Sequence, residues 1–471
     1  MIVSTPEKWD IITRKTGERM FVEKVRLIII DEIHLLSDSR GPVLESIIAR
    51  VTRQNEQNEE EKTRIVGLSA TLPNYKDVAA TLRIRGEGLF YFDQSYRPIP
   101  LEQRYLGVTE KKGVRKMLML NEILYEKVME RVGNFQMIIF VHSRRDTVRT
   151  ANSIKDTAFA KNESTLLMRP ESESKKIIDG IMEKEPVNSK ELKELLQSGI
   201  GIHHAGLSRG DRDLVETLFH DRHFNILVST ATLAWGVNLP AHTVIIKGTQ
   251  VYSPELGRWV ELSLQDVMQM LGRAGRPRFD REGEGIILTG YEEVRYYLSL
   301  LNMQIPLESQ MYTALADQLN AEVVQGSVTS VKDAVNWLSY TYLYVRMLRN
   351  PKHYSIAADE IEEDKELVRR RVNLAHTAFC QLERSGLISY ERRTGAVTPQ
   401  FLGKTASYYY IKHSSMSIYN NNLKSSSSLI DLLRVFAMST EFKYLAVREE
   451  EKNELKKLVE SVPVPIRGAV E

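Results

Sequence analysis

The chain has 471 residues, of which 42% are hydrophobic and 27% charged, and its formal net charge is +2. This length favours several domains, because single hydrophobic cores rarely grow beyond about 250–300 residues. One cysteine excludes an intrachain disulfide framework, and the lack of an apolar run of about 18 residues argues against a membrane span. With so small a net charge, any groove for nucleic acid must be local.

Short apolar runs alternate with helical patterns in the first part of the chain, which is typical of a parallel α/β sheet. The predicted buried strands are Val25–Ile30, Arg64–Leu68, Gln136–Val141, Asn225–Ser229 and Val244–Lys247. Polar residues follow each strand, at the end that opens onto a crevice in parallel sheets. Residues 95–135, which contain Pro98 and Pro100, are predicted to connect a first lobe to a second.

Beyond residue 298 the strand pattern gives way to helical periodicity. The aromatic and aliphatic stripe in 333–351 predicts a helix that packs into a core. Residues 382–398 (LERSGLISYERRTGAVT) predict a helix end followed by a hairpin, which indicates a small winged-helix module.

Two carboxylates, Asp31 and Glu32, end the first predicted strand, and His34 follows. One carboxylate there can hold Mg²⁺, usually through water, while its neighbour polarises the water that attacks a γ-phosphate. Taken alone, the pair fits a solvated strand end equally well. Ser69 and Thr71, after the second predicted strand, offer hydroxyls that can hydrogen-bond to acidic or histidine groups.

The stretch QMLGRAGRPRFD (269–280) is the most specific signal in the second predicted lobe. Arg273 and Arg276 are three residues apart, and we expect both guanidiniums to project from one helical face and neutralise charge on a transferring phosphoryl group. The alternative is a helix with surface arginines. It does not explain Gly272 and Gly275, because each glycine destabilises a helix by about 1 kcal/mol relative to alanine.

Three further stretches suit contact with a sugar–phosphate backbone: STPEKW (4–9), HSRRDT (142–147) and STATLAWGVNLP (229–240). Pro6 predicts a helix start whose free amides face a phosphate. Such contacts position a nucleic acid without reading its sequence. In contrast, the adjacent His203 and His204 have no third ligand at suitable spacing, so a metal site is disfavoured.

The motifs TPEKW, DEIH, SAT, FVHS, STATLAWGVNLP and QMLGRAGR occur in the order of a superfamily-two helicase. Longer runs, such as DEIHLLSDSRGPVLESIIAR and DAVNWLSYTYLYVRMLRNP, extend over essentially the whole chain. They resemble the N-terminal helicase cassette of spliceosomal DExH-box RNA helicases of the U4/U6-unwinding type. The resemblance implies an α/β fold of two RecA-like parallel-sheet lobes, the first truncated at its N-terminus, then a winged helix and the start of a helical (Sec63-like) ratchet domain. The implied boundaries are 1–110, 111–297, 298–402 and 403–471.

The resemblance also implies ATP and Mg²⁺ as cofactors and a role for each motif residue. Asp31 would hold Mg²⁺ and Glu32 would be the general base, with Arg273 and Arg276 as arginine fingers. The implied nucleotide-binding and coupling residues are His34, Ser69, Thr71, Gly236, Asn238 and Gln269. The implied RNA-backbone contacts are Thr5, Pro6, Ser143, Arg144, Thr230 and Thr232.

One element of the family pattern is missing, the phosphate-binding loop G-x-x-x-x-G-K-[ST]. The only Gly-Lys-Thr is 403–405, and Thr398 occupies the position where the pattern requires its first glycine. We therefore expect an internal piece of a larger protein, with an open sheet edge, exposed apolar surface and little or no ATP hydrolysis by this chain alone.

The expected function is a segment of an ATP-dependent RNA helicase that unwinds the U4/U6 small nuclear RNA duplex in pre-mRNA splicing. The expected partners are RNA and spliceosomal proteins, in the nucleus, with no membrane and no small-molecule substrate other than ATP. Two alternatives stay open: a catalytically inactive interaction module, and a helicase of a related DNA or RNA repair family. Backbone-contacting residues do not discriminate between the two sugars.

Overall fold

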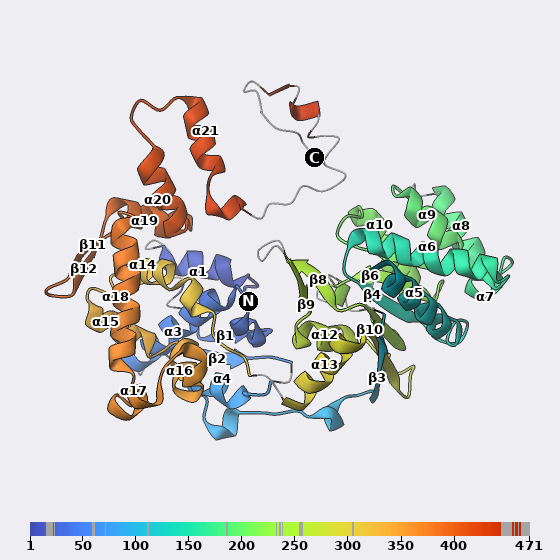
Figure 1. Cartoon of the computed structure of the whole chain (residues 1–471), viewed down its shortest axis with the longest axis horizontal. Coiled ribbons are helices and arrows are strands. Elements are labelled where there is room, and N and C mark those ends of the chain that lie inside the picture. The colour runs from blue at the N-terminus through green and yellow to red at the C-terminus, as the bar shows by residue number, and fades with distance from the viewer. Residues whose placement is uncertain are drawn as a thin grey trace. The chain divides into compact units, whose positions relative to one another are not determined.

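The computed structural model divides the chain into two compact units (Figure 1). The first unit comprises Met1–Tyr91 and Ile305–Glu471, and the second comprises Phe92–Gln304. The described residues are 1–15, 22, 24–58, 62–70, 72–110, 113–184, 187–231, 233–234, 237, 239–253, 258–303, 306–443, 455, 457–459 and 461–462. No helix within these ranges has the length and apolar character that a membrane span requires.

The first unit opens with two parallel strands among helices. Its elements up to residue 91 are α1 (Pro6–Arg14), β1 (Leu27–Ile30), η2 (Ile33–Ser37), α3 (Gly41–Gln57), β2 (Arg64–Gly67), α4 (Tyr75–Thr81) and η3 (Gly86–Gly88). β1 and β2 pair in parallel, with Ile30 opposite Gly67. One side of β1 packs on η2, α3 and α4, with Ile33 and Ile48 at the centre of this small core.

The other side of β1 is apolar and exposed. The side chains of Leu27 and Ile29 are 51% and 58% exposed, whereas Ile30 is 7% exposed. Among the described residues β1 and β2 form a sheet of two strands only. Parallel sheets usually have both faces covered, and this one does not. The exposed apolar surface and the open sheet edge expected from the sequence are therefore present among the described residues.

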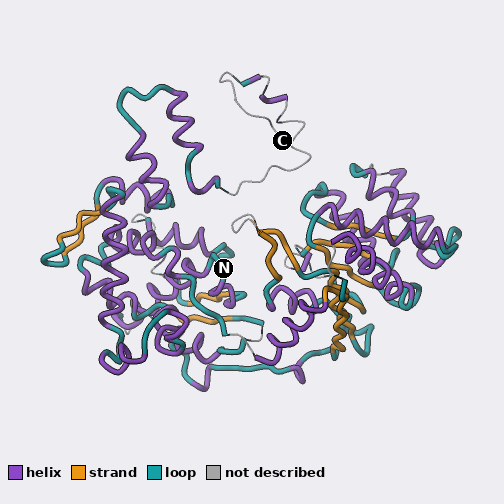
Figure 2. The backbone as a smooth tube through the Cα atoms, viewed as in Figure 1, coloured by secondary structure: helices purple, strands orange, loops and turns teal. Residues whose placement is uncertain are grey.

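The remainder of the first unit is almost entirely helical (Figure 2). Its elements are η5 (Met311–Thr313), α14 (Leu315–Gln325), α15 (Val331–Leu338), α16 (Tyr342–Arg349), η6 (Pro351–Tyr354), α17 (Ala358–Glu363), α18 (Val368–Arg384), β11 (Ile388–Glu391), β12 (Ala396–Pro399), α19 (Phe401–Tyr409), α20 (His413–Asn422), α21 (Leu429–Ala437) and η7 (Thr440–Phe442). The antiparallel β11–β12 hairpin follows α18 directly, as the sequence predicts for a winged helix.

The Gly-Lys-Thr at 403–405 lies inside α19. A Cβ atom on Gly403 would approach the Leu387 carbonyl oxygen to 2.1 Å, so this glycine permits close helix packing. A phosphate-binding loop instead precedes its helix, and the structure therefore agrees with rejecting this motif as a P-loop.

The predicted single helix in 333–351 is two helices, α15 and α16. They are separated because Thr341 accepts a hydrogen bond from the Tyr344 backbone amide and so caps α16. Side-chain capping of this kind competes with helix continuation. Trp337 and Leu338 are fully buried, as a core stripe requires, but Leu348 is 41% exposed.

The second unit is built on one parallel sheet. Its elements are η4 (Gln94–Tyr96), β3 (Leu101–Val108), α5 (Gly113–Met129), β4 (Met137–Val141), α6 (Arg144–Ala160), α7 (Ser164–Leu167), α8 (Glu173–Lys184), α9 (Lys190–Gln197), β5 (Ile200–His203), α10 (Arg209–His220), β6 (Ile226–Thr230), β7 (Thr243–Lys247), β8 (Gln250–Ser253), β9 (Arg258–Glu261), α12 (Leu264–Leu271), β10 (Gly283–Gly290) and α13 (Tyr291–Met303). The six-strand order is β3-β10-β7-β4-β6-β5, with a separate β8–β9 hairpin. Figure 1 shows α12 and α13 on one side of the sheet and α5 and α6 on the other.

The sequence analysis predicted that residues 95–135 connect the two lobes, and the structure corrects this prediction. Within this segment, Leu101–Val108 forms β3, an edge strand that pairs along its whole length with β10. The compact units divide between Tyr91 and Phe92, so β3 and α13 both belong to the second unit. The paired residues of β10 are 182 positions away in sequence, for example Leu101 and Gly283, so local pattern alone does not reveal the pairing.

Buried polar groups join α3 and α4 to the helices that follow residue 305. Arg346 of α16 binds both Asp77 of α4 and Glu308. Glu45 of α3 is fully buried, where it accepts hydrogen bonds from the Ser309 hydroxyl and from the Leu343 amide at 2.9 Å. Burial raises the pKa of the Glu45 carboxyl to about 7, despite these hydrogen bonds.

We expect Glu45 to make stability fall with rising pH. Because its folded-state pKa is raised, its contribution is complete below about pH 4.5 and is lost as pH rises towards 7, by up to about 1.4 kcal/mol per pH unit. Glu45→Gln mimics the protonated acid and should flatten this part of the profile. Urea unfolding of both chains between pH 5 and 8 measures the difference; identical slopes would contradict the assignment.

Candidate nucleotide and nucleic-acid sites

The DEIH segment turns sharply where β1 ends. Glu32 adopts a left-handed backbone conformation with φ 53°, and its amide donates to Asp31 Oδ1 at 2.9 Å. The Ile33 amide binds the Leu68 carbonyl oxygen at 2.9 Å and so keeps the ends of β1 and β2 together. A non-glycine residue in this conformation is strained, and such strain concentrates at functional sites.

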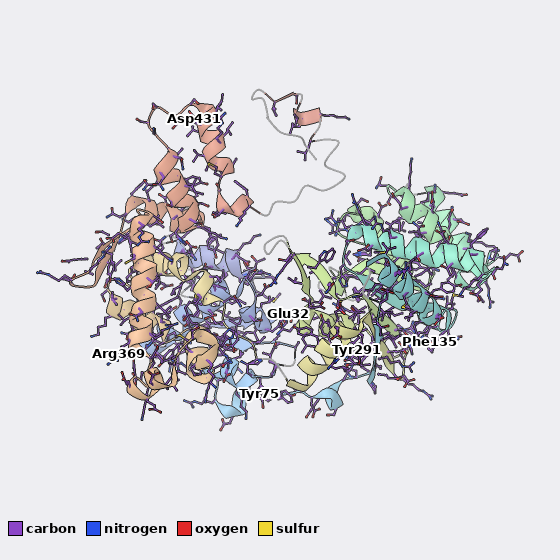
Figure 3. All side chains as sticks on the ribbon, in the orientation of Figure 1. Glu32, Tyr75, Phe135, Tyr291, Arg369 and Asp431 are labelled. Atoms are coloured by element: carbon purple, nitrogen blue, oxygen red, sulfur yellow. The ribbon has the colours of Figure 1, made fainter. Side chains whose placement is uncertain are left out.

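Three predicted residues meet at His34. This imidazole is buried, and its Nδ1 lies 3.2 Å from Glu32 Oε2 and 3.4 Å from Ser69 Oγ. Glu32, labelled in Figure 3, is partly exposed, so its carboxylate contacts both the histidine and the surface. The histidine is therefore placed to link the acid after β1 to the hydroxyl after β2.

Asp31 extends into solvent from the same turn. One of its oxygens accepts the Glu32 amide, which leaves the other available to a hydrated cation. The described residues contain no group of three or more metal-ligating side chains. A Mg²⁺ ion at Asp31 would therefore take most of its ligands from water and phosphate oxygens, as this ion commonly does.

Thr5 and Pro6 begin α1, as predicted. The Thr5 hydroxyl accepts from the Lys8 amide at 3.4 Å, and Pro6 occupies the first helical turn. Glu7 and Arg40 form two hydrogen bonds of 2.7 and 3.0 Å, which hold this helix end beside the start of α3. Arg40 keeps the pKa of the Glu7 carboxyl below its usual value.

The two predicted finger arginines do not share a helical face, which corrects the sequence analysis. Helix α12, which carries Gln269, ends at Leu271, and the chain then turns through Gly275 with φ 88°. A Cβ on Gly275 would lie 2.6 Å from Ile99 Cγ2, so the glycine is required by the turn and by close packing. The helical-penalty argument for these glycines therefore does not apply.

Each finger arginine is held by its own partners. Arg273 donates to the carbonyl oxygen of Ala234. Arg276 donates through Nε and Nη2 to the two oxygens of Asp280, at 2.9 and 2.8 Å, and through Nη1 to Gln136 Oε1 at 2.9 Å. Burial raises the pKa of the Asp280 carboxyl, but its hydrogen bonds to Arg276 outweigh burial and lower it overall.

Three predicted RNA contacts gather at the carboxyl edge of the second sheet. Thr230 is the last residue of β6 and pairs with Val141 of β4. Ser143 follows β4 and caps α6 by accepting from the Asp146 amide at 3.0 Å. Arg144 is the first residue of α6. Arg276, in contrast, binds Gln136 at the amino end of β4, so the two predicted groups lie at opposite edges of this sheet.

The adjacent histidines of the sequence analysis contact different partners within the second unit. His203 Nε2 lies 2.9 Å from Glu216 Oε1, and His204 Nδ1 accepts from the Gly206 amide at 3.1 Å. Burial, together with nearby Arg144, lowers the pKa of His204 to about 4.

Sequence reasoning missed several charged partners of the motifs. Asp280 follows Arg276 at a spacing of four, which is the signal that could have identified it. Lys247, at the end of β7, donates to Thr150 Oγ1 at 2.8 Å, and burial lowers its pKa to about 8.

Four predicted residues lie outside the described residues: Thr71, Thr232, Gly236 and Asn238.

Four family models match consecutive parts of the chain. Residues 1–78 match the DEAD/DEAH box helicase model and residues 166–278 the helicase conserved C-terminal domain. Residues 308–384 match a winged helix-turn-helix domain. Residues 399–471 match the Sec63 Brl domain.

Curated relatives match the chain over its full length. The U5 small nuclear ribonucleoprotein 200 kDa helicase of Drosophila melanogaster is 58% identical, and the DExH-box ATP-dependent RNA helicase DExH12 of Arabidopsis thaliana is 54% identical. A Dictyostelium discoideum protein named activating signal cointegrator 1 complex subunit 3-like is 57% identical. In each case 100% of this chain is covered, but it spans only 21–22% of the relative.

We expect Asp280→Asn to destabilise the second unit. It leaves the largely buried Arg276 guanidinium without its counter-charge, which costs about 3 kcal/mol for a buried pair. Urea unfolding followed by circular dichroism measures the loss. Asp213→Asn is the matched control, because Arg209 and Asp213 have the same spacing on the exposed surface of α10 and should change stability little. Equal effects of the two substitutions would refute the assignment.

Proposed function

Since this chain belongs to the DEAD/DEAH-box helicases, in the group that includes the U5 small nuclear ribonucleoprotein 200 kDa helicase, we propose that it is a segment of an ATP-dependent RNA helicase of the spliceosome. The proposed substrate is the U4/U6 small nuclear RNA duplex, and the proposed location is the nucleus with spliceosomal proteins as partners. The contact of Glu32, His34 and Ser69 is the observation that supports this best.

In the proposed mechanism, Glu32 takes a proton from the water that attacks the γ-phosphate of ATP. Asp31 would hold Mg²⁺, which when bound neutralises charge on the triphosphate. His34 touches both Glu32 and Ser69, so a change at the nucleotide alters a buried group that joins the two strand ends. Ser69 and Thr71 then relay the state of the site.

Arg273 and Arg276 are the proposed fingers, with Gln269, Gly236 and Asn238 beside the nucleotide. For Arg276, this role requires that the bidentate bond to Asp280 either orient the guanidinium or open when ATP binds. Arginine suits such a role, because its planar group binds phosphate through two parallel hydrogen bonds.

RNA is proposed to contact the chain through its sugar–phosphate backbone. Thr5 and Pro6 present the first turn of α1, where amides and the positive end of the helix dipole favour a phosphate. In the second unit, Ser143, Arg144 and Thr230, at the carboxyl edge of the sheet, are proposed contacts. Thr232 is a further proposed contact from the sequence motif.

A second candidate function is an inactive interaction module. The exposed apolar side of β1 and the absence of G-x-x-x-x-G-K-[ST] from this sequence favour it. Under this alternative, the chain binds a partner without hydrolysing ATP. A repair helicase is the third possibility, and the backbone contacts do not discriminate against it.

We expect this chain alone to bind single-stranded RNA but to hydrolyse ATP at background rate, because it encodes no phosphate-binding loop. Binding is measured by fluorescence anisotropy, and hydrolysis by phosphate release with and without RNA. Replacing both Ser143 and Thr230 by alanine should weaken RNA binding, by about 1 kcal/mol per lost hydrogen bond. Robust RNA-stimulated hydrolysis would overturn the expectation, and undetectable RNA binding would favour the interaction module.

A further inference from the structure

Helix α1 is held in the first unit by charge rather than by apolar packing. Of its nine residues, Asp10 is the only one that is buried. Its apolar residues Ile11 and Ile12 are only partly buried. The position of α1 therefore depends on polar contacts, chiefly those of the Asp10 carboxylate, together with the Glu7–Arg40 pair at its first turn.

The partners of Asp10 outside α1 come from α3 and from the residue after α19, and Arg50 extends the contact to α14. Arg50 of α3 donates to Asp10 Oδ1 at 2.6 Å and, through Nε, to Glu322 of α14 at 2.5 Å. Tyr410, directly after α19, donates its hydroxyl proton to Asp10 Oδ2 at 2.9 Å. One carboxylate on α1 thus connects to α3, to the helix that opens the winged-helix part, and to the segment matched by the Sec63 model.

A second arginine strengthens the same junction. Arg14, one turn along α1, donates to Asp10 Oδ2 at 2.6 Å and to Gln318 of α14 at 3.1 Å. Its guanidinium lies over the ring of Tyr410, 4.5 Å from the centroid. Two arginines therefore face two acids, Asp10 and Glu322, and the buried charges balance.

The Asp10 carboxyl is held in its ionised form in this setting. Burial raises the pKa of the Asp10 carboxyl, but Arg50 and Arg14 outweigh burial and lower it overall. Neutralising Asp10 would leave two poorly exposed guanidiniums without a common acceptor, which folded proteins tolerate badly.

We propose that Asp10 and Arg50 are positioning residues for RNA binding: they orient α1 so that its Thr5–Pro6 end meets the backbone, and they tie that contact to the winged-helix and Sec63-like parts. Neither residue touches RNA in this account. The inference rests on the proposed function, because it requires that Thr5 and Pro6 contact nucleic acid. It predicts that RNA affinity depends on a carboxylate that RNA does not reach.

The test compares Asp10→Asn with Asp77→Asn in the full 471-residue chain. Asp77 pairs with Arg346 in the same unit but between α4 and α16, so its loss is a matched control for broken ion pairing. We expect Asp10→Asn to weaken binding of labelled single-stranded RNA about five-fold, and Asp77→Asn to lower thermal stability comparably with unchanged affinity. Equal RNA affinities of the two variants, both folded, would overturn the proposal.

A double-mutant cycle separates positioning from general loss of structure. Thr5→Ala should weaken RNA binding, and adding Asp10→Asn to it should cause little further loss, because both changes act through the same helix end. Independent, additive losses would count against the proposal. Arg50→Lys keeps the charge but cannot bridge two acids as the guanidinium does, so it should reproduce part of the Asp10→Asn defect.

Hydrogen exchange of α1 amides provides a readout that needs no RNA. Faster exchange confined to α1 in Asp10→Asn, but absent in Asp77→Asn, supports the positioning role. If the unmodified chain fails to bind RNA, the proposed function fails, while the exchange result still decides whether Asp10 holds α1. Unchanged exchange in Asp10→Asn would overturn the positioning role itself.

Discussion

The first unit depends on a charge network in which Arg50 bridges Asp10 and Glu322. Segments more than 270 residues apart in the chain meet at this arginine. A buried charge requires a partner of opposite sign with defined geometry, so this junction admits few alternative arrangements of its helices. Apolar contacts have no preferred direction, so they would allow one helix to shift along another. Paired guanidinium and carboxylate groups hydrogen-bond in a defined geometry and so fix one arrangement of the helices.

In the second unit, the parallel direction of the six strands determines which residues lie close together. Their carboxyl ends bring Thr230, Ser143 and Arg144 together, although these residues belong to separate motifs. The arginine segment lies elsewhere, because the chain returns to the amino edge of the sheet before β10, where the Gly275 amide donates to the carbonyl oxygen of Ala241, just ahead of β7. The proposed finger arginine Arg276 and the proposed RNA contacts therefore lie at opposite edges of one sheet.

The motif residues were predictable where local order decides the structure. DEIH follows a strand, TPEKW begins a helix, and the β11–β12 hairpin follows α18, because strand ends, proline and turn residues act over a few positions. The connector at 95–135 and the single helix at 333–351 were wrong for one reason. Pairing of β3 with β10 and capping by Thr341 depend on contacts or side-chain competition that hydrophobic pattern does not encode.

The sequence by itself determined the family, the order of its parts and the two acids that follow the first strand, since motif identity and strand-end position are properties of short segments. Tertiary structure alone decided which charges meet: Arg276 with Asp280, His34 with Glu32 and Ser69, and Arg50 with Asp10 and Glu322. The physical reason is that a buried ion is stable only beside a suitably placed partner, and the packed fold sets that placement.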